Sequence, residues 1–398
     1  RTVPVGQRMS AADAWSWSVG VNVNAVKEST MRKTRSPARA RARRPAKPLP
    51  PWHQRCGMRV YEHGAAANIF APPLLLAFGF LSAAQRGVWF VSLLLIVAYQ
   101  KSTTAAAKSR GKKLQPYLHI CLPMYFASLT LGVAAERPLR AVALVLLLIV
   151  AKVGCCMSVC LHRYAGHGAF KCGPTTNALL CVLGCLANQG GPIWWGSKHR
   201  CHHSRCDKEH DPHSPLISGA IDAFQFHTLQ EHKDVDPEYR PSHCDTYGAR
   251  LIDTFSFVPV SLELALSFVI GGPAALWVCY VSGWLSQTLA LWFNVINHSP
   301  TDKTELHPCA SGDSTHFVFP VAKNREMHPN ALFAFFSHFQ WVAQLTGESA
   351  HDHHHDHSSL ARRPGVDLPY HLLVRPLHAA GLIWGLKLPK CDLPPPDE

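Results

Sequence analysis

Long apolar segments separated by short polar breaks run through most of this chain. The clearest are residues 67–99, 117–134, 138–160, 255–270 and 274–297. About 20 apolar residues span a bilayer as a helix, so this pattern predicts an integral membrane protein. Gln85 and Arg86 interrupt the first segment, which is therefore either one long span or a tight hairpin. Two further segments, 176–195 and 331–346, are less apolar or shorter.

The composition agrees with this class. The chain is 47% hydrophobic and only 16% charged, whereas soluble domains average about 25% charged residues. The net charge of +13 arises mostly in residues 1–60, which hold 13 of the 39 Lys and Arg residues and two of the 26 acids. The remainder is nearly neutral, so the charge is no argument for nucleic-acid binding. Residues 1–60 are expected to be a disordered basic segment, either a targeting peptide or a solvated tail near anionic lipid.

Histidines cluster just beyond the ends of the apolar segments. Nine of them fall into three clusters and one single position: His162 and His167; His199, His202 and His203; His351, His354 and His355; and His298. Neutral imidazole is the commonest metal ligand in proteins. One ion takes roughly four to six ligands, so nine histidines predict a two-metal site and an enzyme.

The spacing of these histidines restricts how the chain crosses the membrane. Each three-residue cluster has i, i+3, i+4 spacing, which places its members on one face of a helix. His162 and His167 are five residues apart, so we expect them at a helix end where the backbone turns. All nine can meet only if 176–195 and 331–346 lie along or above the membrane. The basic residues of 101–113 are expected to form a loop on the same side of the membrane as the nine histidines. Positively charged loops face the cytosol or its equivalent, so we expect the histidines there too.

Polar residues beside the clusters give weaker signals. Metal-bound imidazoles need hydrogen-bond acceptors, and the nearby acids are Asp207, Glu209, Asp211, Asp352 and Asp356. The Asp211-Pro212 turn is expected to direct His210 and His213 away from the second cluster.

A zinc transporter with a histidine-rich loop is the alternative from a different class of protein. Transporters place polar ligands near the middle of the membrane, whereas these clusters lie beyond the span ends. The 14 cysteines are scattered and contain no CxxC pair for zinc. We expect them to be reduced residues of the protein core.

The motifs HRYAGH, HRCHH and HDHHH, in this order around paired apolar segments, resemble those of the membrane-bound fatty-acid desaturases. The closest resemblance is to the stearoyl-CoA (delta-9) type, and it runs from about residue 117 to about 390. It includes GGPIWW before the second cluster, DPHSP after it, Asn294 four residues before His298, and the closing GLKLP.

This resemblance implies an all-α membrane enzyme with four main transmembrane helices and a cytosolic helical cap that holds two irons. The nine histidines would be direct ligands, and Asn294 would hold a metal through water. No organic cofactor site is implied. The implied reaction inserts a cis double bond into the saturated chain of an acyl-CoA or acyl-lipid, with O2 and two electrons. Its location would be the endoplasmic reticulum membrane, with a plastid membrane as the alternative.

The chain also departs from the delta-9 pattern. Gly168 and Ala169 follow the first cluster where Arg and Ser are usual, and Ala350 replaces a bulky residue before the third. These changes leave the histidines intact. They weaken the assignment to the delta-9 type, so a desaturase that acts at another position and a related diiron hydroxylase stay as alternatives. No HPGG motif is present, so the electron donor, cytochrome b5 or ferredoxin, is expected to be a separate protein. The expected domains are 1–60, an extra apolar segment and basic loop at 61–116, the desaturase domain at 117–390, and a tail at 391–398.

Overall fold

A computed structural model describes residues 57–108, 122–132, 137–228, 230–298, 336 and 338–389. The chain divides into two compact units, residues 1–48 and 49–398, and every described residue belongs to the second. The predicted disordered segment, apart from its last four residues, and the predicted tail lie outside the described residues.

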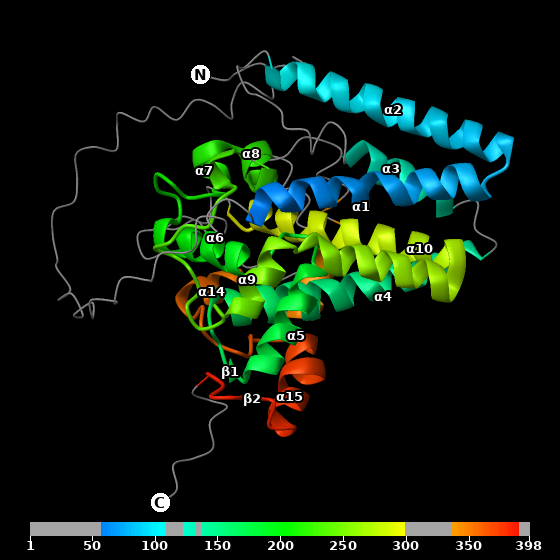
Figure 1. The fold of residues 1–398 in the computed structure, drawn as a ribbon. Helices are drawn as coiled ribbons and strands as arrows, with labels where there is room; N and C mark the ends of the chain where they lie inside the picture. The colour runs from blue at the N-terminus through cyan, green and yellow to red at the C-terminus, as the bar shows by residue number, and fades with distance from the viewer. Residues whose placement is uncertain are drawn as a thin grey trace, which may run out of the picture. The chain divides into compact units, whose positions relative to one another are not determined.

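Helices dominate the described unit, as Figure 1 shows, and the predicted all-α membrane fold is confirmed. Four helices are long and apolar enough to cross a membrane: Glu62–Phe80, Ala83–Lys101, Pro138–Gly166 and Phe257–Ile296. They lie within α1 (Gly57–Phe80), α2 (Ala83–Lys108), α4 (Pro138–Ala151) continued by the π-helix η5 (Lys152–Gly166), and α10 (Phe257–Ile296). Among the described residues, these helices include the predicted spans at 138–160, 255–270 and 274–297, the last two both within α10, and the first apolar segment supplies α1 and α2.

The first apolar segment forms the hairpin rather than one long span. The chain turns between α1 and α2, where Ser82 N donates to Gln85 Oε1 (3.0 Å) and Gln85 N donates to Ser82 Oγ (3.3 Å). This reciprocal pair is a capping box that begins α2. Helix α2 then continues to Lys108. The expectation of a loop at 101–113 is therefore wrong over its first eight residues, because the alanines there favour a helix.

Only residues 122–132 of the predicted span at 117–134 lie among the described residues. Within them, the helix α3 covers Leu122–Leu131. The two predicted spans at 255–270 and 274–297 form α10, which is interrupted at Gly272 (φ 64°). Cys279 Sγ lies 3.8 Å from Glu263 Oε1. Sixteen residues of straight helix would separate these residues by about 24 Å, so α10 folds back as a hairpin at Gly272.

Side chains of α10 bind the neighbouring helices together. Trp277 Nε1 donates to Ser128 O of α3 (2.7 Å), and Tyr280 OH donates to Ile69 O of α1 (2.8 Å). The buried Lys152 Nζ lies 2.6 Å from Oε2 of the partly exposed Glu263, so an ion pair joins the start of η5 to the first half of α10. Leaving the buried Lys152 ammonium without this partner would be costly, so the pair helps to hold the two spans together.

Shorter elements form the rest of the unit around the ends of these helices. They are α5 (Pro174–Cys185), α6 (Pro192–Arg205), α7 (Pro215–Ser218), α8 (Ala220–Phe224), η6 (Phe226–Thr228), η7 (Gln230–His232), α9 (Tyr247–Thr254), α13 (Gln340–Thr346), α14 (His351–Asp356), η9 (Tyr370–Val374) and α15 (Arg375–Ala379). Helices α5 and α13 have twelve and seven residues, too short to span a bilayer. For 176–195 this agrees with the expectation that the segment stays on one side, whereas residues 331–335 and 337 of the other segment lie outside the described residues.

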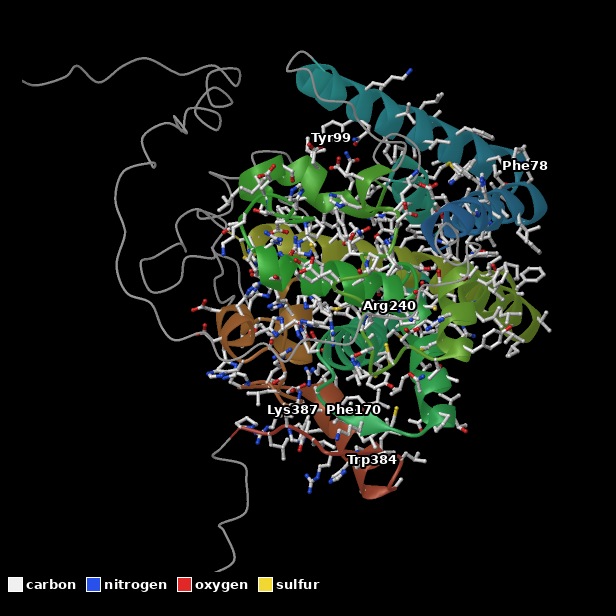
Figure 2. All side chains as sticks on the ribbon, turned by 60° about the vertical axis from the view of Figure 1, so that its left-hand side comes forward. Phe78, Tyr99, Phe170, Arg240, Trp384 and Lys387 are labelled. Carbon is white, nitrogen blue, oxygen red and sulfur yellow. The ribbon has the colours of Figure 1, made fainter. Side chains whose placement is uncertain are left out.

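The C-terminal part of the described chain returns to the first histidine cluster. Strands β1 (Lys171–Cys172) and β2 (Ile383–Trp384) pair antiparallel. Lys387 N donates to Ala169 O (3.1 Å), two residues after His167. Figure 2 shows Phe170, Trp384 and Lys387 in this region. The closing GLKLP motif thus supports the loop that follows the first cluster.

Most of the described cysteines fit the expectation of reduced core residues. Nine are free, and six of these are buried. Cys206 is disulfide-bonded, so the expectation is wrong for this residue.

Candidate metal centre

The π-helix η5 brings the first two histidines onto one face. His167 N donates to His162 O (3.1 Å), a bond across five residues, which is the bond of π-helical winding. The two imidazole centroids are 5.2 Å apart. The helix ends at Gly166, so the expected helix end is confirmed. The wider winding is what brings together histidines that a regular α-helix would splay.

A buried carboxylate fixes the helix that carries the second cluster. Asp253 Oδ1 accepts from Ile193 N (2.8 Å) and Trp194 N (2.9 Å), and so caps the first turn of α6. A side chain at Gly191 would collide with this carboxylate, since its Cβ would lie 2.2 Å from Oδ1. Burial raises the pKa of Asp253 to about 6, although the two backbone hydrogen bonds act in the opposite direction and lower it. The glycines before Pro192 therefore make room for the cap.

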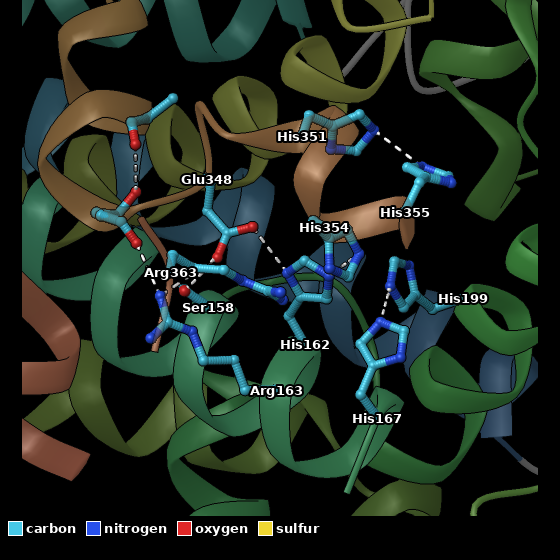
Figure 3. A network of polar contacts seen from close by, with 12 residues as sticks. Ser158, His162, Arg163, His167, His199, Glu348, His351, His354, His355 and Arg363 are labelled. Atoms are coloured by element: carbon cyan, nitrogen blue, oxygen red, sulfur yellow. Dashed lines mark hydrogen bonds and ion pairs between the residues drawn. The ribbon is translucent and has the colours of Figure 1, made fainter. Parts of the chain in front are cut away.

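Five histidines converge at one point, and we call them the five-histidine group: His162, His167, His199, His203 and His354. Their facing nitrogens lie within 4.8 Å of one another. The closest Nε2–Nε2 distances are 2.7 Å for His167 and His199 and 2.8 Å for His162 and His354. Figure 3 shows His162, His167, His199 and His354 of this group meeting from different helices. Imidazole nitrogens this close form a suitable ligand set for one cation.

The other four form a second group, the four-histidine group: His202, His298, His351 and His355. His351 Nε2 lies 2.9 Å from His298 Nε2 and 3.2 Å from His355 Nε2. The His202 ring centroid is 4.8 Å from that of His298 and 5.3 Å from that of His355. His202 Nε2 is buried and has no hydrogen-bond partner in the protein. A bound cation would satisfy that nitrogen, so these residues fit a second metal ion.

The three-residue clusters are divided between the two groups in opposite ways. Helix α6 gives His199 and His203 to the five-histidine group and His202 to the four-histidine group. Helix α14 gives His351 and His355 to the four-histidine group and His354 to the other. In each helix the i, i+4 pair stays together and the i+3 histidine goes to the other group. The structure therefore brings all nine predicted histidines into one double site.

Two buried carboxylates orient one histidine in each group. His162 Nδ1 lies 2.8 Å from Glu348 Oε2, and His202 Nδ1 lies 3.0 and 3.1 Å from the two oxygens of Asp211. Donation through Nδ1 leaves the Nε2 lone pair directed at the group, as metal ligation requires. Asp211 was among the five acids predicted for this role. Glu348 was not, although it precedes the third cluster by only three residues. Glu209 is solvent-exposed.

The electrostatics favour neutral imidazoles and ionised carboxylates. Burial, followed by neighbouring positive charge, lowers the pKa of His199, His203 and His351 well below the usual value. Burial opposes the ionisation of Glu348, but its contact with His162 and the charges of nearby arginines outweigh this and lower its pKa. Neutral imidazole is the form that binds metal.

A buried ion pair holds the third cluster to the first. Arg163 Nη1 and Nη2 donate to the two oxygens of Asp367 at 2.8 and 2.9 Å. The same nitrogens donate to Ala361 O and Thr346 O, on either side of α14. Arg163 directly follows His162, so the bidentate pair sets the position of α14 relative to η5 (Figure 3).

A small, mostly apolar pocket of about 70 Å³ adjoins both groups. Its lining includes Met157, Gln189, Trp195, Phe226, Leu291 and Phe293, together with His162, His199 and His351. Gln189 Oε1 accepts from Trp195 Nε1 (3.0 Å), and Gln189 Nε2 is buried without a partner. Asn294 also lines the pocket, where its Nδ2 donates to His213 O (3.0 Å). The pocket places apolar side chains directly beside the histidines.

The expectation for His213 is wrong. His213 is buried against His202, with ring centroids 4.1 Å apart, whereas His210 is exposed as expected. His213 N donates to Asp211 Oδ1 (3.1 Å). This short side-chain turn folds the segment back onto α6 instead of away from it.

Comparison with known proteins gives relatives of related chemistry, while no family model matches the chain. The chain is 29% identical over 254 residues to a hex-5-enoyl-[acyl-carrier protein] acetylenase of Moorena producens, covering 60% of this chain and 74% of the relative. It is 26% identical over 288 residues to an sn-1 stearoyl-lipid 9-desaturase of Anabaena variabilis, covering 69% of this chain and 96% of the relative.

A third relative is a chloroplastic palmitoyl-monogalactosyldiacylglycerol delta-7 desaturase of Arabidopsis thaliana, 26% identical over 245 residues, or 57% of each chain. The match thus spans little more than half the length of this relative. The comparisons support the fatty-acid desaturase family. The delta-7 and 9-desaturase relatives differ in the position at which they act, so membership of the family does not fix the regiochemistry.

Proposed function

We propose that this chain is a membrane fatty-acyl desaturase that uses O2 and two iron ions. The observation that carries the proposal is the double histidine site beside an apolar pocket, at the ends of helices long enough to cross a membrane. The reaction removes two hydrogens from adjacent methylenes and forms a cis double bond. With two electrons and two protons, O2 leaves as two molecules of water.

In this proposal the five-histidine group holds one iron, and the four-histidine group holds the other together with Asn294 through a water. Iron with imidazole ligands supplies the oxidising power that an unactivated methylene requires. Asn294 lies in the last turn of α10, which ends at Ile296, and His298 follows two residues after that end. The amide orientation of Asn294 is fixed by donation to His213 O.

The chain's own residues position the substrate and exclude water. The apolar lining around Met157, Leu291 and Phe293 binds methylenes and keeps competing water away from the site. Asp211 and Glu348 hold His202 and His162 in place, which keeps the distance between ligands and substrate constant.

Delta-9 insertion into an acyl-CoA or acyl-lipid is the favoured regiochemistry. The alternatives are another double-bond position and a related diiron hydroxylase. The names of the relatives, which include a delta-7 desaturase and an acetylenase, support testing these directly. A zinc transporter is the remote alternative. It would require bound zinc and no consumption of O2.

The organisation around this domain is part of the proposal. Residues 117–390 would form the desaturase domain, preceded by the added hairpin of α1 and α2 in 61–116. A separate cytochrome b5 or ferredoxin would supply the electrons. The endoplasmic reticulum membrane is favoured and a plastid membrane is the alternative.

Expression in desaturase-deficient yeast with fatty-acid profiling tests the proposal. We expect a new cis-monounsaturated product from the full chain and none from His202→Ala. His210→Ala is the matched control, because His210 lies near the same cluster but is exposed. Metal analysis of the purified protein should give two irons per chain. A protein that holds zinc and forms no unsaturated product would refute the proposal.

A further inference from the structure

Arg363 is a fully buried arginine whose guanidinium lacks partners. The residue is 0% exposed. Its Nε and Nη2 have no hydrogen-bond partner, and Nη1 makes only a long contact of 3.5 Å with His357 O. Nearly all buried polar groups in proteins are hydrogen-bonded, and leaving one unpaired is costly. Two unpaired donors on one buried cation therefore indicate a missing acceptor.

The nearby carboxylates do not provide this acceptor. Both oxygens of Asp367 accept from Arg163, and they also accept from the backbone of Arg363 and Tyr370. The oxygens of Glu348 face His162 Nδ1 and the Ser158 hydroxyl. Within the part of the chain that the structure describes, no carboxylate lies within 4.0 Å of the Arg363 guanidinium.

The guanidinium lies beside the five-histidine group. Figure 3 shows the Arg363 side chain directed past Glu348 toward His162 and His354. His354 Nδ1 is also buried without a partner. Among the described residues, the unpaired donors of Arg363 thus lie in this corner of the site beside neutral imidazoles.

We propose that the Nε–Nη2 edge of Arg363 binds a small monovalent inorganic anion next to the five-histidine group. Parallel N–H groups on one edge of a guanidinium are suited to anions. The charges of Arg163 and Arg363 are balanced by Asp367 and Glu348, and neutral imidazoles add no negative charge. Two bound cations would then leave the site strongly positive. In this respect the inference rests on the proposed function, since the anion would offset part of that charge.

Bromide is the probe, because it scatters anomalously and has the size of a small anion. We expect an anomalous peak at the Arg363 edge in crystals of the full-length protein grown in bromide. The peak should be absent in Arg363→Met and retained in Arg362→Met. Arg362 is the matched control, since it is the neighbouring arginine and packs on the Tyr370 ring. A water without anomalous signal at this edge would overturn the inference.

Thermal unfolding gives a second readout, because a ligand that binds the folded state raises its stability. Wild type and Arg362→Met should unfold at a higher temperature in bromide than in gluconate, a much larger anion of the same charge. Arg363→Met should show no difference. An equal bromide effect in all three proteins would contradict the proposal. If Arg363→Met does not fold, the anomalous peak in wild type decides. Metal content is measured separately, so a protein with two irons and no bromide refutes this inference alone.

Discussion

Replacing Asp367 by Asn should strongly destabilise the protein. Asp367 is 1% exposed and accepts four hydrogen bonds, two from Arg163 and one each from the backbone of Arg363 and Tyr370. Asparagine removes the negative charge and turns one acceptor into a donor. Arg163, which is 0% exposed, then keeps only Glu348 at 3.8 Å as a counter-charge. Breaking a buried pair in this way costs about 3–5 kcal/mol.

The effect should extend to the site. Arg163 also donates to Thr346 O and Ala361 O, which flank the helix that carries His351, His354 and His355. Loosening this anchor should lower the iron content of the purified protein. The free energy of unfolding is measured by denaturant titration in detergent micelles. Glu62→Gln is the control, because its pair with Lys233 is partly exposed and should be worth no more than about 1 kcal/mol.

A double variant separates loss of charge balance from loss of packing. In Arg163→Met with Asp367→Leu, both charges are removed together, and most of the lost stability should return. A cost below about 1 kcal/mol for Asp367→Asn would refute the reasoning. So would a double variant as unstable as the single one, because the unpaired charge would then not be the cause.

Four further outcomes are expected. His202→Ala should abolish desaturation while the protein still inserts into membranes, as measured by product analysis and carbonate extraction; full activity would remove His202 from the site. Cysteines placed near His167 and near His357 should be labelled from the same side of the membrane, and labelling from opposite sides would break the two-metal interpretation. Asp253→Ala should cost about 1–2 kcal/mol through loss of the α6 cap, whereas Asp253→Asn, which keeps an acceptor, should cost less in the same titration. A chain that begins near Cys56 should remain active in fatty-acid profiling when delivered to a suitable membrane; loss of activity in a folded, inserted protein would give residues 1–60 a role in docking.

The histidine pattern predicted the site better than the apolar pattern predicted the spans. Spacing depends on local helix geometry, so all nine histidines could be identified from the sequence. The number of spans depends on where each helix ends, and that is decided by capping and by packing between distant segments. Ser82 and Gln85 make a hairpin of one apolar run. The contact between Cys279 and Glu263 shows the fold-back at Gly272.

Contacts between distant residues were the hardest to predict. Glu348 reaches His162 across 186 positions of the chain, and nothing in its local sequence indicates that contact. The π-helical winding that brings His162 and His167 together is likewise absent from a pattern that assumes 3.6 residues per turn. Asp211 was easier to predict, because it lies nine residues from His202 in the same segment.

The opposite division of the two triplets follows from helix geometry. Successive residues are about 100° apart around a helix axis, so i and i+4 differ by about 40°, while i+3 lies about 100° from i+4. Each triplet therefore directs the imidazoles of residues i and i+4 at one point, while the imidazole of residue i+3 points to one side of that point. The triplets of α6 and α14 each send that i+3 histidine to the other's pair. Asn294, in the last turn of α10, lines the same pocket as His351 of the four-histidine group, which is the geometric reason to place the asparagine with that group.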